Sequence, residues 1–401
     1  MKILHVNNKF HFQGGSEQYL YAICRELARE GHENAVVHGS AGSTHDDAEV
    51  SGAYYIHGLN EFNRGLRHEL RGQIQAIVER EGPDIVYLHN ITNPYLVEAM
   101  TELRPVVKYV HDHEFYCAKG IRIVNNELCT NSFLPRCVMN AVRGNGYLCM
   151  GGRSRPMAVA STVRKMFLNR RAHQRISHFI VAGSHMQGSL ISQGVREDRI
   201  TVIPYFTEIP ENVTPDSGSS TILFVGRISP EKGLEIFLES LSLLEQDFRF
   251  LIAGDGDPGY ISVLRKSIRK KRLEEKVEFA GWVGNSEIGS YLERSAFLVV
   301  PSIWPEPFGI VGIEAMAHSR PAMAFNVGGI SGWLEDRKTG FLIKRNDTRE
   351  FAGHMDLLLR DRALRQEFGR NAYQRASLLY NGGRHMRKLL SGFKDVLHSQ
   401  K

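Results

Sequence analysis

The sequence has no long hydrophobic run. At no point do about eighteen apolar residues follow one another, so no segment is expected to span a membrane. The first residues, MKILHVNN, contain one lysine and a short apolar strand, which is too short for the core of a signal peptide. We therefore expect a cytoplasmic protein, either alone or peripheral on the inner face of the membrane.

The sequence also lacks a strong excess of charge of either sign. Its 401 residues have a formal net charge of +6, and 23% of them are charged. That mild excess permits a phosphate-bearing ligand or contact with an anionic membrane surface, but it does not require nucleic acid. No nucleic-acid-binding motif occurs, so we expect no nucleic-acid partner.

Cysteine is scarce, and no C-x-x-C pair is present. Four of the five cysteines fall in a Gly-, Asn- and Arg-rich insert at about 113–152, namely Cys117, Cys129, Cys137 and Cys149. The missing C-x-x-C weakens the case for a zinc ribbon, and a reducing cytosol disfavours disulfides. Structural zinc held by these four cysteines is therefore one prediction, beside disulfides and unlinked packing of the thiols.

What the sequence does have is a regular alternation of strand and helix patterns. Short β-rich runs such as KILHVNN, DIVYLHN, TILFVGRI and AFLVVPS are separated by helical stretches. The helix after the first strand is expected to have Ser16 as its N-cap and to stop at Gly31. This alternation predicts parallel sheets covered by helices on both faces.

The length and a shift in composition predict two domains. Residues 207–220 are rich in Pro, Ser and acidic side chains, which is typical of a linker. It would join an N-terminal domain over 1–206 to a C-terminal domain over 221–378, followed by a helix over 379–401 that could cross back to the first domain. The expected fold is α/β, with two tandem Rossmann-like, doubly wound domains facing a central cleft.

Two glycines stand at the first junction between a strand and a helix. Gly14 and Gly15 precede the expected helix start, where backbone N–H groups and the helix dipole favour an anion. Without Cβ atoms, they let a phosphate or a sugar approach the backbone. A flexible, well-capped loop explains the same pair of residues, so this motif is weak by itself.

The stretch GRISPEKG lies at the equivalent junction of the second domain. Gly226 permits a close turn, and Pro230 and Glu231 suit the start of a helix. Arg227 and Lys232 would then both project at the helix entrance, where two cations can neutralise a diphosphate. A solvated basic loop would explain the charges, but not their place at the end of a strand.

The stretch PEPFGIVGIEAMA adds two glutamates. A helix is expected to begin near Phe308 or Gly309, so that the N–H groups of Phe308, Gly309 and Ile310 form a nest for an anion or a hydroxyl. Glu306 lies in the loop before this helix, and Glu314 falls roughly 7 Å along the helix axis from Gly309. Carboxylates at these two places suit the paired hydroxyls of one ligand.

In this order, the motifs GGSE, HD, GRISPEKG and EPFGIVGIEAMA resemble those of the retaining glycosyltransferases of family 4, which have the GT-B fold. The resemblance covers most of the chain, and its specific part is the pair Glu306 and Glu314. It implies a metal-independent hexosyltransferase that moves a sugar from a nucleotide-diphosphate sugar to a hydroxyl of a glycan or lipid-linked acceptor. Synthesis of cell-surface polysaccharide or lipopolysaccharide is the implied setting, and no cofactor is required.

The same resemblance implies a role for each domain and motif. The first domain would be the acceptor side and the second the donor side, and a subset of the family has a similar cysteine-bearing insert after the HD motif. The catalytic candidates are His111, Arg227, Lys232 and Glu306. The donor-binding candidates are Gly14, Gly15, Glu17, Gly226, Trp282, Val283, Phe308, Gly309, Ile310 and Glu314.

Within these sets, the resemblance distinguishes what each residue would hold. Arg227 and Lys232 would bind the donor diphosphate, while Glu314 would bind the ribose. Glu306 and His111 would contact the transferred sugar, and we expect His111 to orient that sugar rather than to act as an obligatory base. The stretch around Trp282 and Val283 would hold the nucleobase through backbone groups.

Two short patterns resemble catalytic metal sites, but local backbone structure accounts for each of them better. DGD at 255–257 spells a metal-binding D-x-D, but it follows a strand and precedes a proline, as a strand-end turn does. HDHE at 111–114 is expected to be extended, and alternate side chains of an extended segment point to opposite faces. We therefore predict no catalytic metal.

A basic segment over 153–175 admits two interpretations. Its cations are Arg153, Arg155, Arg164, Lys165, Arg170, Arg171 and Arg175. A basic amphipathic helix could lie on an anionic membrane, which would favour a lipid-linked acceptor. Alternatively, a surface helix packs Val163, Met166 and Phe167 into its own domain.

Two other classes of function stay open. GT-B folds also occur in epimerases and phosphorylases that act on nucleotide sugars or sugar phosphates, and a non-catalytic protein could bind a sugar nucleotide. A non-catalytic protein would tolerate the loss of Glu306 or His111, and both are present. Backbone contacts to the nucleobase leave the donor base undetermined.

Overall fold

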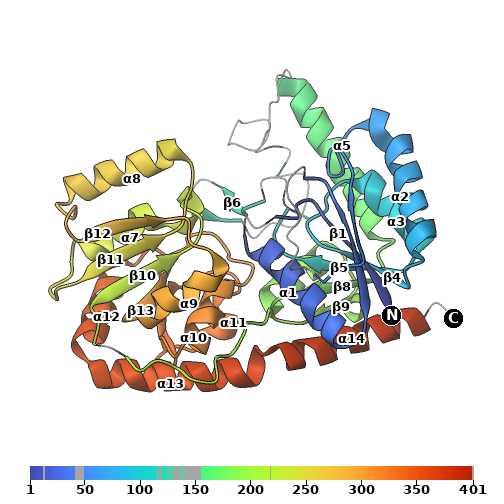
Figure 1. The fold of residues 1–401 in the computed structure, drawn as a ribbon. Helices are drawn as coiled ribbons and strands as arrows, with labels where there is room; N and C mark the ends of the chain where they lie inside the picture. The colour runs from blue at the N-terminus through green and yellow to red at the C-terminus, as the bar shows by residue number, and fades with distance from the viewer. Residues whose placement is uncertain are drawn as a thin grey trace. The chain divides into compact units, whose positions relative to one another are not determined.

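Two parallel β-sheets form the centres of two units in the computed structural model (Figure 1). The structure describes residues 1–11, 14–40, 49–114, 117, 120–124, 127–129, 137, 139, 155–216 and 218–399. One unit consists of Met1–Ile203 with Met386–Lys401, and the other of Pro204–His385. The last helix, α14 (Gly382–His398), thus contributes most of its length to the first unit.

The sheet of the first unit has seven parallel strands in the order β3-β2-β1-β4-β5-β8-β9. Their bounds are β1 (Lys2–Asn7), β2 (Glu33–His38), β3 (Gly52–Tyr55), β4 (Ile85–Leu88), β5 (Val106–Val110), β8 (His178–Val181) and β9 (Ile200–Val202). The helices are α1 (Gly15–Arg29), α2 (Arg67–Glu81), α3 (Pro94–Leu103), α5 (Arg155–His173) and α6 (Ser184–Ser192). Two short strands, β6 (Ile123–Val124) and β7 (Glu127–Leu128), pair separately and antiparallel.

The sheet of the second unit has six parallel strands in the order β12-β11-β10-β13-β14-β15. Their bounds are β10 (Thr221–Val225), β11 (Arg249–Ala253), β12 (Val277–Gly281), β13 (Phe297–Val300), β14 (Ala322–Phe325) and β15 (Gly340–Ile343). The helices are α7 (Leu234–Leu241), α8 (Pro258–Lys270), α9 (Asn285–Glu293), α10 (Ile310–Ala317), α11 (Ile330–Trp333), α12 (Thr348–Arg360) and α13 (Arg362–Leu379). The predicted α/β class with doubly wound parallel sheets is confirmed in both units.

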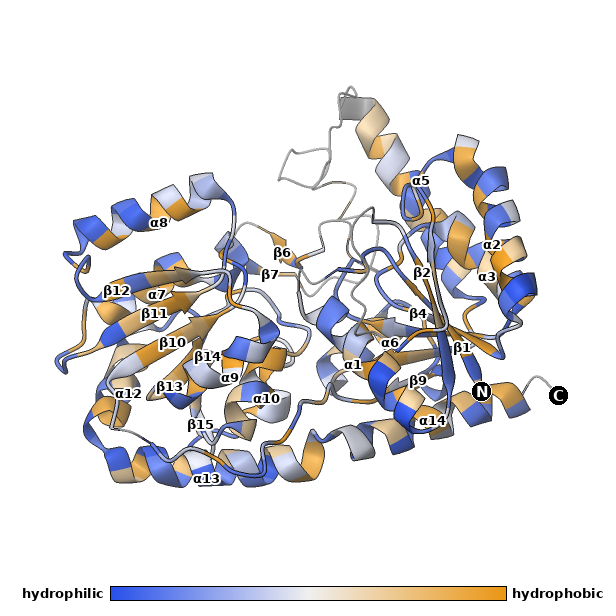
Figure 2. Cartoon of the chain, in the orientation of Figure 1, coloured by the Kyte–Doolittle hydropathy of each residue, from blue (hydrophilic) through white to orange (hydrophobic). Residues whose placement is uncertain are grey.

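The strands are apolar because helices cover both of their faces. In β4, β13 and β14 every residue is buried, and Figure 2 shows the strands of both sheets mainly in the hydrophobic colour. Both sheets also share one winding, in which the first strand of the unit lies beside the fourth. This order creates a switch point between β1 and β4 and another between β10 and β13, where ligands of doubly wound sheets bind.

The start of α1 differs from our expectation. Its N-cap is Gly14, not Ser16, because the helix already begins at Gly15. The Ser16 hydroxyl instead donates a hydrogen bond to Glu17 and accepts one from the Asn90 amide. The expected stop is confirmed, since Gly31 follows the helix with a φ of 78°, a conformation that favours glycine.

Residues 207–220, where the composition predicts a linker, are attached to the second unit. The Thr207 N–H donates to the carbonyl oxygen of Tyr380 at 2.9 Å. The buried Arg320 guanidinium donates to the carbonyl oxygen of Thr214 at 3.1 Å, and Arg365 donates to Asp216 at 3.0 Å. These contacts satisfy backbone groups that a free linker would leave to water.

The cysteine insert lies largely outside the described residues, and Cys149 is among those not described. Cys117 is buried, and so is Cys24 on α1, where burial raises the pKa of the thiol. Within the described residues, no group of three or more His, Cys, Asp or Glu side chains could hold a metal ion. The role of the four insert cysteines, zinc included, stays a prediction.

Helix α5 carries most of the basic segment, although Arg153 lies outside the described residues. Helix α5 packs against α3. Its Met166 is buried, whereas its Met157 and Phe167 are exposed. The apolar side chains are therefore divided between the interior and the surface. Across the described parts of the chain, no helix has the length and apolar character needed to cross a membrane.

The fold predicts opposite effects for one substitution at two helical glycines. A Cβ added at Gly312 in α10 would lie 2.3 Å from the ring of the fully buried Trp333, whereas none of the described atoms lies within 4 Å at Gly353 in α12. We expect Gly312→Ala to lower the free energy of unfolding by about 1–3 kcal/mol through overpacking. Gly353→Ala should raise it by up to about 1 kcal/mol through helix propensity.

Urea denaturation followed by circular dichroism measures both changes. Gly353→Ala is the matched control, since it makes the same chemical change at an exposed position of a helix. A Gly312→Ala variant that gains as much stability as Gly353→Ala would contradict the packing of Trp333 against α10.

Candidate functional site

The switch point of the second sheet brings two sequence motifs together. Strands β10 and β13 pair in parallel, with Ile222 opposite Phe297, so both end at the same edge of the sheet. The loop 226–233 follows β10, and the loop 301–309 follows β13. The first loop contains Arg227 and Lys232, and the second contains Glu306. The order of the strands makes these two loops neighbours.

Lys232 and Glu306 form a salt bridge across these loops. The Lys232 Nζ lies 2.6 Å from the Glu306 Oε1, and the Ser302 hydroxyl also donates to that oxygen. The Glu306 side chain is only 4% exposed, and the Lys232 ammonium lies 5.6 Å from the centre of the Trp304 ring. The buried carboxylate is thus held by an ammonium and a hydroxyl, and the ammonium in turn faces an aromatic ring.

The pKa of Glu306 reflects two opposing effects. Burial by itself raises the pKa of this carboxyl, because a charged group loses its hydration. The charge of Lys232 and the hydrogen bonds from Lys232 and Ser302 outweigh burial, so the pKa lies below its ordinary value. Glu306 is therefore ionised at neutral pH, and its oxygens are hydrogen-bond acceptors.

Glycines allow the loops around Glu306 to approach so closely. Gly233 has a φ of 72°, and a Cβ there would lie 2.0 Å from the Pro301 carbonyl oxygen. Gly328 has a φ of 58°, and a Cβ would lie 2.3 Å from the Glu306 carbonyl oxygen. No other residue fits either position without moving the backbone.

The helix after GRISPEKG begins later than expected. Pro230–Lys232 form a single 3-10 turn, and α7 starts only at Leu234, after Gly233. The positive φ of Gly233 separates the two helical segments and leaves Lys232 at the end of the turn. Pro230 and Glu231 do open a helical turn, as expected, but it is this separate 3-10 turn and not α7, and Lys232 lies before α7.

Helix α10 starts where the sequence predicts. Its N-cap is Gly309, with a φ of 92°, and Ile310 is its first residue. The side chain of Phe308 is buried against Tyr205 and Tyr380, and its carbonyl oxygen accepts a hydrogen bond of 2.6 Å from the Trp333 indole. Glu314 follows on the same helix and is half-buried.

Arg227 pairs with a different carboxylate from Lys232. Its side chain is 62% exposed, and its guanidinium lies 3.7 Å from Glu231, so it is a solvated charge at the surface of the loop. Gly226 has a φ of 148° and contacts Gly254 so closely that a Cβ at Gly254 would lie 1.9 Å from the Gly226 carbonyl oxygen.

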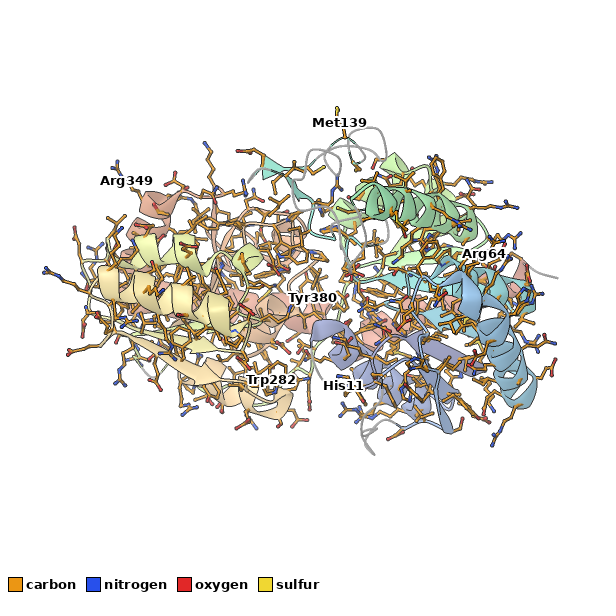
Figure 3. All side chains as sticks on the ribbon, turned by 90° about the horizontal axis from the view of Figure 1, so that it is seen from above. His11, Arg64, Met139, Trp282, Arg349 and Tyr380 are labelled. Atoms are coloured by element: carbon orange, nitrogen blue, oxygen red, sulfur yellow. The ribbon has the colours of Figure 1, made fainter. Side chains whose placement is uncertain are left out.

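The predicted nucleobase segment is at the surface of the second unit. Trp282 is exposed, as Figure 3 shows, and Val283 is half-buried. An exposed tryptophan at the end of a strand is uncommon, because a large ring gains from burial. Its position after β12 places it at the carboxyl edge of the same sheet as Arg227 and Lys232.

The DGD stretch is a turn, as we expected. Asp257 is the N-cap of α8, and its carboxylate accepts a hydrogen bond of 2.9 Å from the Tyr260 N–H. Asp255 accepts from the N–H of Gly256, and the backbone of Gly256 pairs with Ile228. Both carboxylates thus have structural partners at a strand end.

In the first unit, the glycine loop forms the start of α1. Gly14 has an extended backbone with a φ of −175°, which any residue adopts, and the nearest atom to an added Cβ would be 3.5 Å away. Neither the backbone angle nor the described neighbours thus require glycine at 14. Glu17 is buried one turn further, where Ser16 donates to it at 2.9 Å.

His111 ends a chain of three buried histidines that crosses adjacent strands. His5 in β1 lies 3.2 Å from His89 after β4, and His89 lies 3.0 Å from His111 after β5. At the other end, His5 Nε2 lies 3.1 Å from the Asn34 Oδ1. The chain therefore links the amide of Asn34 to the candidate His111.

The Asn34 amide fixes the direction of this chain. Its Nδ2 donates to the carbonyl oxygens of Cys24 and Glu49, so its Oδ1 must accept from His5 Nε2–H. His5 Nδ1 then accepts from His89 Nε2–H, and His89 Nδ1 accepts from His111 Nε2–H. Each ring has one defined neutral tautomer, and His111 donates through Nε2.

Burial keeps these rings neutral. Loss of hydration, with a smaller effect of the nearby Lys108, lowers the pKa of His111 to about 3. Burial also lowers the pKa of His5 to about 4 and that of His89 well below its ordinary value. Lys108 itself donates to the carbonyl oxygens of His89 and Ile91, and burial lowers its pKa to about 8.

Several residues of the site were not predicted from the sequence. Ser302 lies four positions before Glu306, and Gly328 and Gly329 form a second glycine pair after a strand, a signal of the same kind as Gly14 and Gly15. His5 and His89 each stand near the end of an apolar strand, in KILHVNN and DIVYLHN. Polar residues repeated at the ends of neighbouring strands would have revealed them.

Two family models match the chain. The model described as glycosyl transferases group 1 matches residues 206–375, and the model described as glycosyltransferase family 4 matches residues 13–208. The alpha-D-kanosaminyltransferase of Streptomyces kanamyceticus is 35% identical over 154 residues, 38% of this chain and 39% of that protein. The chain matches about two fifths of the length of such curated relatives.

Solved structures share the whole fold. Anabaena Alr3699/HepE in complex with UDP and glucose has a TM-score of 0.73 and 19% identity, over 98% of this chain and all of that one. The lipopolysaccharide outer core galactosyltransferase WaaB has a TM-score of 0.68 and 13% identity, over 100% of both chains. The solved structures show the fold, which is GT-B, and the two family models show that the chain belongs to the glycosyltransferases of family 4.

Proposed function

We propose that this protein is a retaining glycosyltransferase. It moves a sugar from a nucleotide-diphosphate sugar to a hydroxyl of a glycan or lipid-linked acceptor. The observation that carries the proposal is the buried ion pair of Lys232 and Glu306 at the switch point of the second sheet. The complexes of Alr3699/HepE with UDP and glucose support a donor of this class.

The family resemblance gives each donor-side residue a role, and the charge of each side chain suits that role. Arg227 and Lys232 bind the diphosphate and stabilise the charge that develops on it as it leaves, without a metal ion. Glu306 accepts hydrogen bonds from hydroxyls of the transferred sugar, and Glu314 accepts them from the ribose. The N–H groups at the start of α10 and the strand end at Trp282 and Val283 complete donor binding.

The reaction is a displacement at the anomeric carbon. The bond from that carbon to the diphosphate breaks, and the acceptor hydroxyl forms the new bond from the same face. The departing phosphate takes the proton of the hydroxyl, so no protein base is needed. Gly14, Gly15 and Glu17 serve the donor phosphate from the first unit, and His111 orients the donor sugar as a neutral imidazole.

The acceptor and the place of action complete the proposal. The names of kanosaminyltransferase and of the lipopolysaccharide outer core galactosyltransferase WaaB indicate that similar proteins transfer different sugars, and only the second name gives an acceptor. We propose an acceptor of cell-surface polysaccharide or lipopolysaccharide synthesis. The enzyme would act in the cytoplasm, with the basic segment 153–175 as a contact to the inner membrane face.

Thermal-shift screening tests the proposal. UDP, GDP and ADP, and their sugars, are added to the full-length protein, because a ligand that binds the folded state raises the melting temperature. We expect at least one nucleoside diphosphate to stabilise it, and Arg227→Ala and Lys232→Ala to abolish the shift. No shift by any of these nucleotides in the wild-type protein would refute donor binding. Formation of an epimer without transfer would instead favour an epimerase.

Two variants can distinguish the catalytic role of Lys232 from its role in stability. Lys232→Met should reduce sugar transfer at least about 100-fold, or roughly 2.7 kcal/mol of transition-state stabilisation. It also leaves Glu306 buried without its cation, so burial raises the pKa of that carboxyl above its value in the unfolded chain. A raised folded pKa makes the variant more stable at low pH, so its loss of stability should be larger at pH 8 than at pH 5.

The double variant Lys232→Met with Glu306→Gln distinguishes the two effects. It removes the buried charge, and we expect it to regain stability at pH 8 but not activity. Lys338→Met is the matched control, because Lys338 forms an exposed ion pair with Glu335 whose loss should change little. Turnover close to the wild-type rate in Lys232→Met would remove this lysine from the reaction.

The pH dependence of the reaction tests the role of His111. With a pKa of about 3, the ring stays neutral from pH 5 to 8. The pH profile of kcat/KM for the wild-type enzyme should therefore show no fall near pH 6.5 that is caused by protonation of His111. His111→Gln should lower kcat/KM while keeping the shape of the profile, whereas a general base would give an acid limb that this substitution abolishes.

A further inference from the structure

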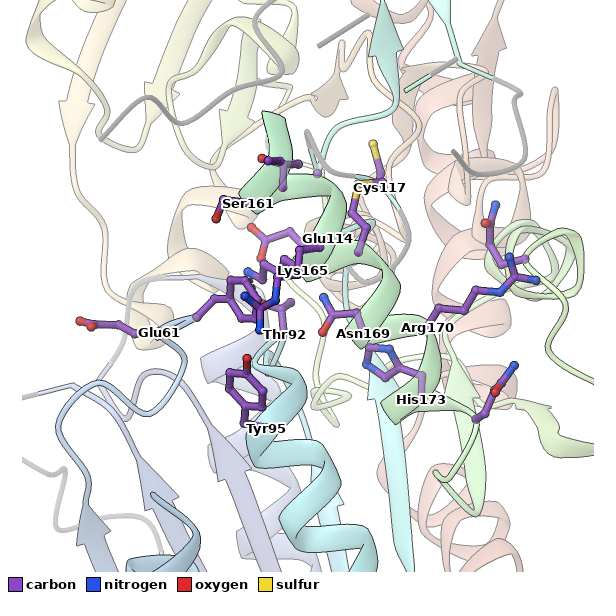
Figure 4. A pocket seen from close by; sticks show the side chains of 18 of the residues that line it. Glu61, Thr92, Tyr95, Glu114, Cys117, Ser161, Lys165, Asn169, Arg170 and His173 are labelled. Atoms are coloured by element: carbon purple, nitrogen blue, oxygen red, sulfur yellow. Dashed lines mark hydrogen bonds between the residues drawn. The ribbon is translucent and has the colours of Figure 1, made fainter. Parts of the chain in front are cut away.

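The first unit contains a pocket of about 1070 Å³ that the candidate site does not use. It runs along α5, and its other walls come from the loop 61–64, the head of α3 and Glu114 with Cys117. Figure 4 shows Lys165, Asn169 and His173 projecting from α5 toward Thr92 and Tyr95. A pocket of this size holds a ligand of one or two sugar rings.

One buried polar atom of this pocket, the Asn169 Oδ1, finds no hydrogen-bond partner among the described residues. Asn169 is 7% exposed, and its Oδ1 accepts no hydrogen bond from any described residue. Buried amide oxygens nearly always have a donor, because leaving one unpaired costs free energy. An amide oxygen only accepts, so the missing partner is a donor, such as a ligand hydroxyl.

The pocket carries an excess of positive charge. Its cationic lining residues are Arg64, Arg164, Lys165, Arg170 and Arg199, and its acidic ones are Glu61 and Glu114. Lys165 is half-buried, and its Nζ donates to the hydroxyl of the buried Thr92 at 3.2 Å. The Thr92 hydroxyl donates to the Asn60 Oδ1 over a long 3.5 Å, a weak contact that a phosphate oxygen can replace, so that the ammonium and the hydroxyl donate to one phosphate ester.

Aromatic rings form part of the wall. Phe62 and Tyr95 stack with centroids 5.6 Å apart and planes 17° apart, and both line the pocket. The guanidinium of Arg67 also covers the Tyr95 ring, with its carbon 5.3 Å from the ring centre. A fixed aromatic surface suits the C–H face of a sugar ring or a short hydrocarbon segment.

We propose that this pocket binds a phosphorylated, hydroxyl-bearing acceptor, that is, a sugar or polyol phosphate. The phosphate lies at Lys165 and Thr92, and a ligand hydroxyl donates to Asn169 Oδ1. Calling this ligand the acceptor rests on the proposed function, whereas its binding does not. The phosphate ester belongs either to a soluble molecule or to a membrane lipid, because both present the same chemistry.

Isothermal titration calorimetry of the full-length protein tests the binding. The probes are glucose 6-phosphate, glycerol 3-phosphate, glucose and inorganic phosphate. We expect at least one of the two phosphate esters to bind at least about tenfold more tightly than glucose or phosphate alone. Asn169→Leu and Lys165→Met should each weaken that binding at least about tenfold, and Lys165→Met should remove the preference for the phosphorylated sugar.

Arg171→Met is the matched control, because Arg171 is an exposed cation of the same helix that does not line the pocket. It should bind the esters as the wild type does. The proposal is overturned if neither ester binds better than glucose and phosphate and vesicle binding also fails. Equal binding by wild type, Asn169→Leu and Lys165→Met, or displacement of the ester by UDP, would overturn it as well.

Vesicles distinguish the two sources of the phosphate ester. Phosphatidylglycerol presents the glycerol phosphate group in a membrane, and phosphatidylcholine vesicles are the control. Capture by phosphatidylglycerol that Lys165→Met reduces more than Arg171→Met supports a lipid ligand, and ester binding without capture supports a soluble one. UDP binding is measured in every variant, so a failure of the pocket with intact UDP binding is distinct from a failure of the glycosyltransferase proposal.

Discussion

The candidate donor site depends on one interaction, the buried ion pair of Lys232 and Glu306. A carboxylate taken out of water loses several kcal/mol of hydration, and it stays ionised only if close partners replace that hydration. Lys232 at 2.6 Å and the hydroxyl of Ser302 do so. Their partnership requires the loops after β10 and β13 to touch, which Gly233 permits, while Gly328 lets the loop after β14 pack against the backbone of Glu306. These two glycines therefore serve the ion pair before they serve any ligand.

The first unit also buries polar side chains at the ends of its strands, but these side chains are uncharged. Three buried histidines at the ends of β1, β4 and β5 form a row of hydrogen bonds between Asn34 and His111. Each ring donates through its Nε2–H toward Asn34. A charged ring in this chain would lack both hydration and a counterion, and burial accordingly lowers each pKa. The result is an imidazole with a fixed orientation and tautomer, which suits positioning better than proton transfer.

Local patterns predicted the elements and their order, because strand and helix periodicity is a property of neighbouring residues. The start of α10 at Gly309 and the turn at Asp257 were predictable for the same reason. The Lys232–Glu306 pair joins residues 74 positions apart, and His5 and His89 are 84 apart. Such contacts depend on which strands lie side by side. The apolar sequence of a strand does not show which other strand pairs with it. The prediction of Ser16 as a cap was wrong because its hydroxyl has competing partners in Asn90 and Glu17.

The two cations of GRISPEKG are not equivalent, and the difference has a consequence under the proposed function. Lys232 is already neutralised by Glu306, whereas Arg227 is exposed and only loosely paired with Glu231 at 3.7 Å. A diphosphate would meet the exposed charge of Arg227 first and then compete with Glu306 for Lys232. As the ammonium turns toward the phosphate, the Glu306 oxygens gain capacity to accept hydrogen bonds from sugar hydroxyls. The ion pair would thus couple capture of the diphosphate to recognition of the sugar, which neither residue could do alone.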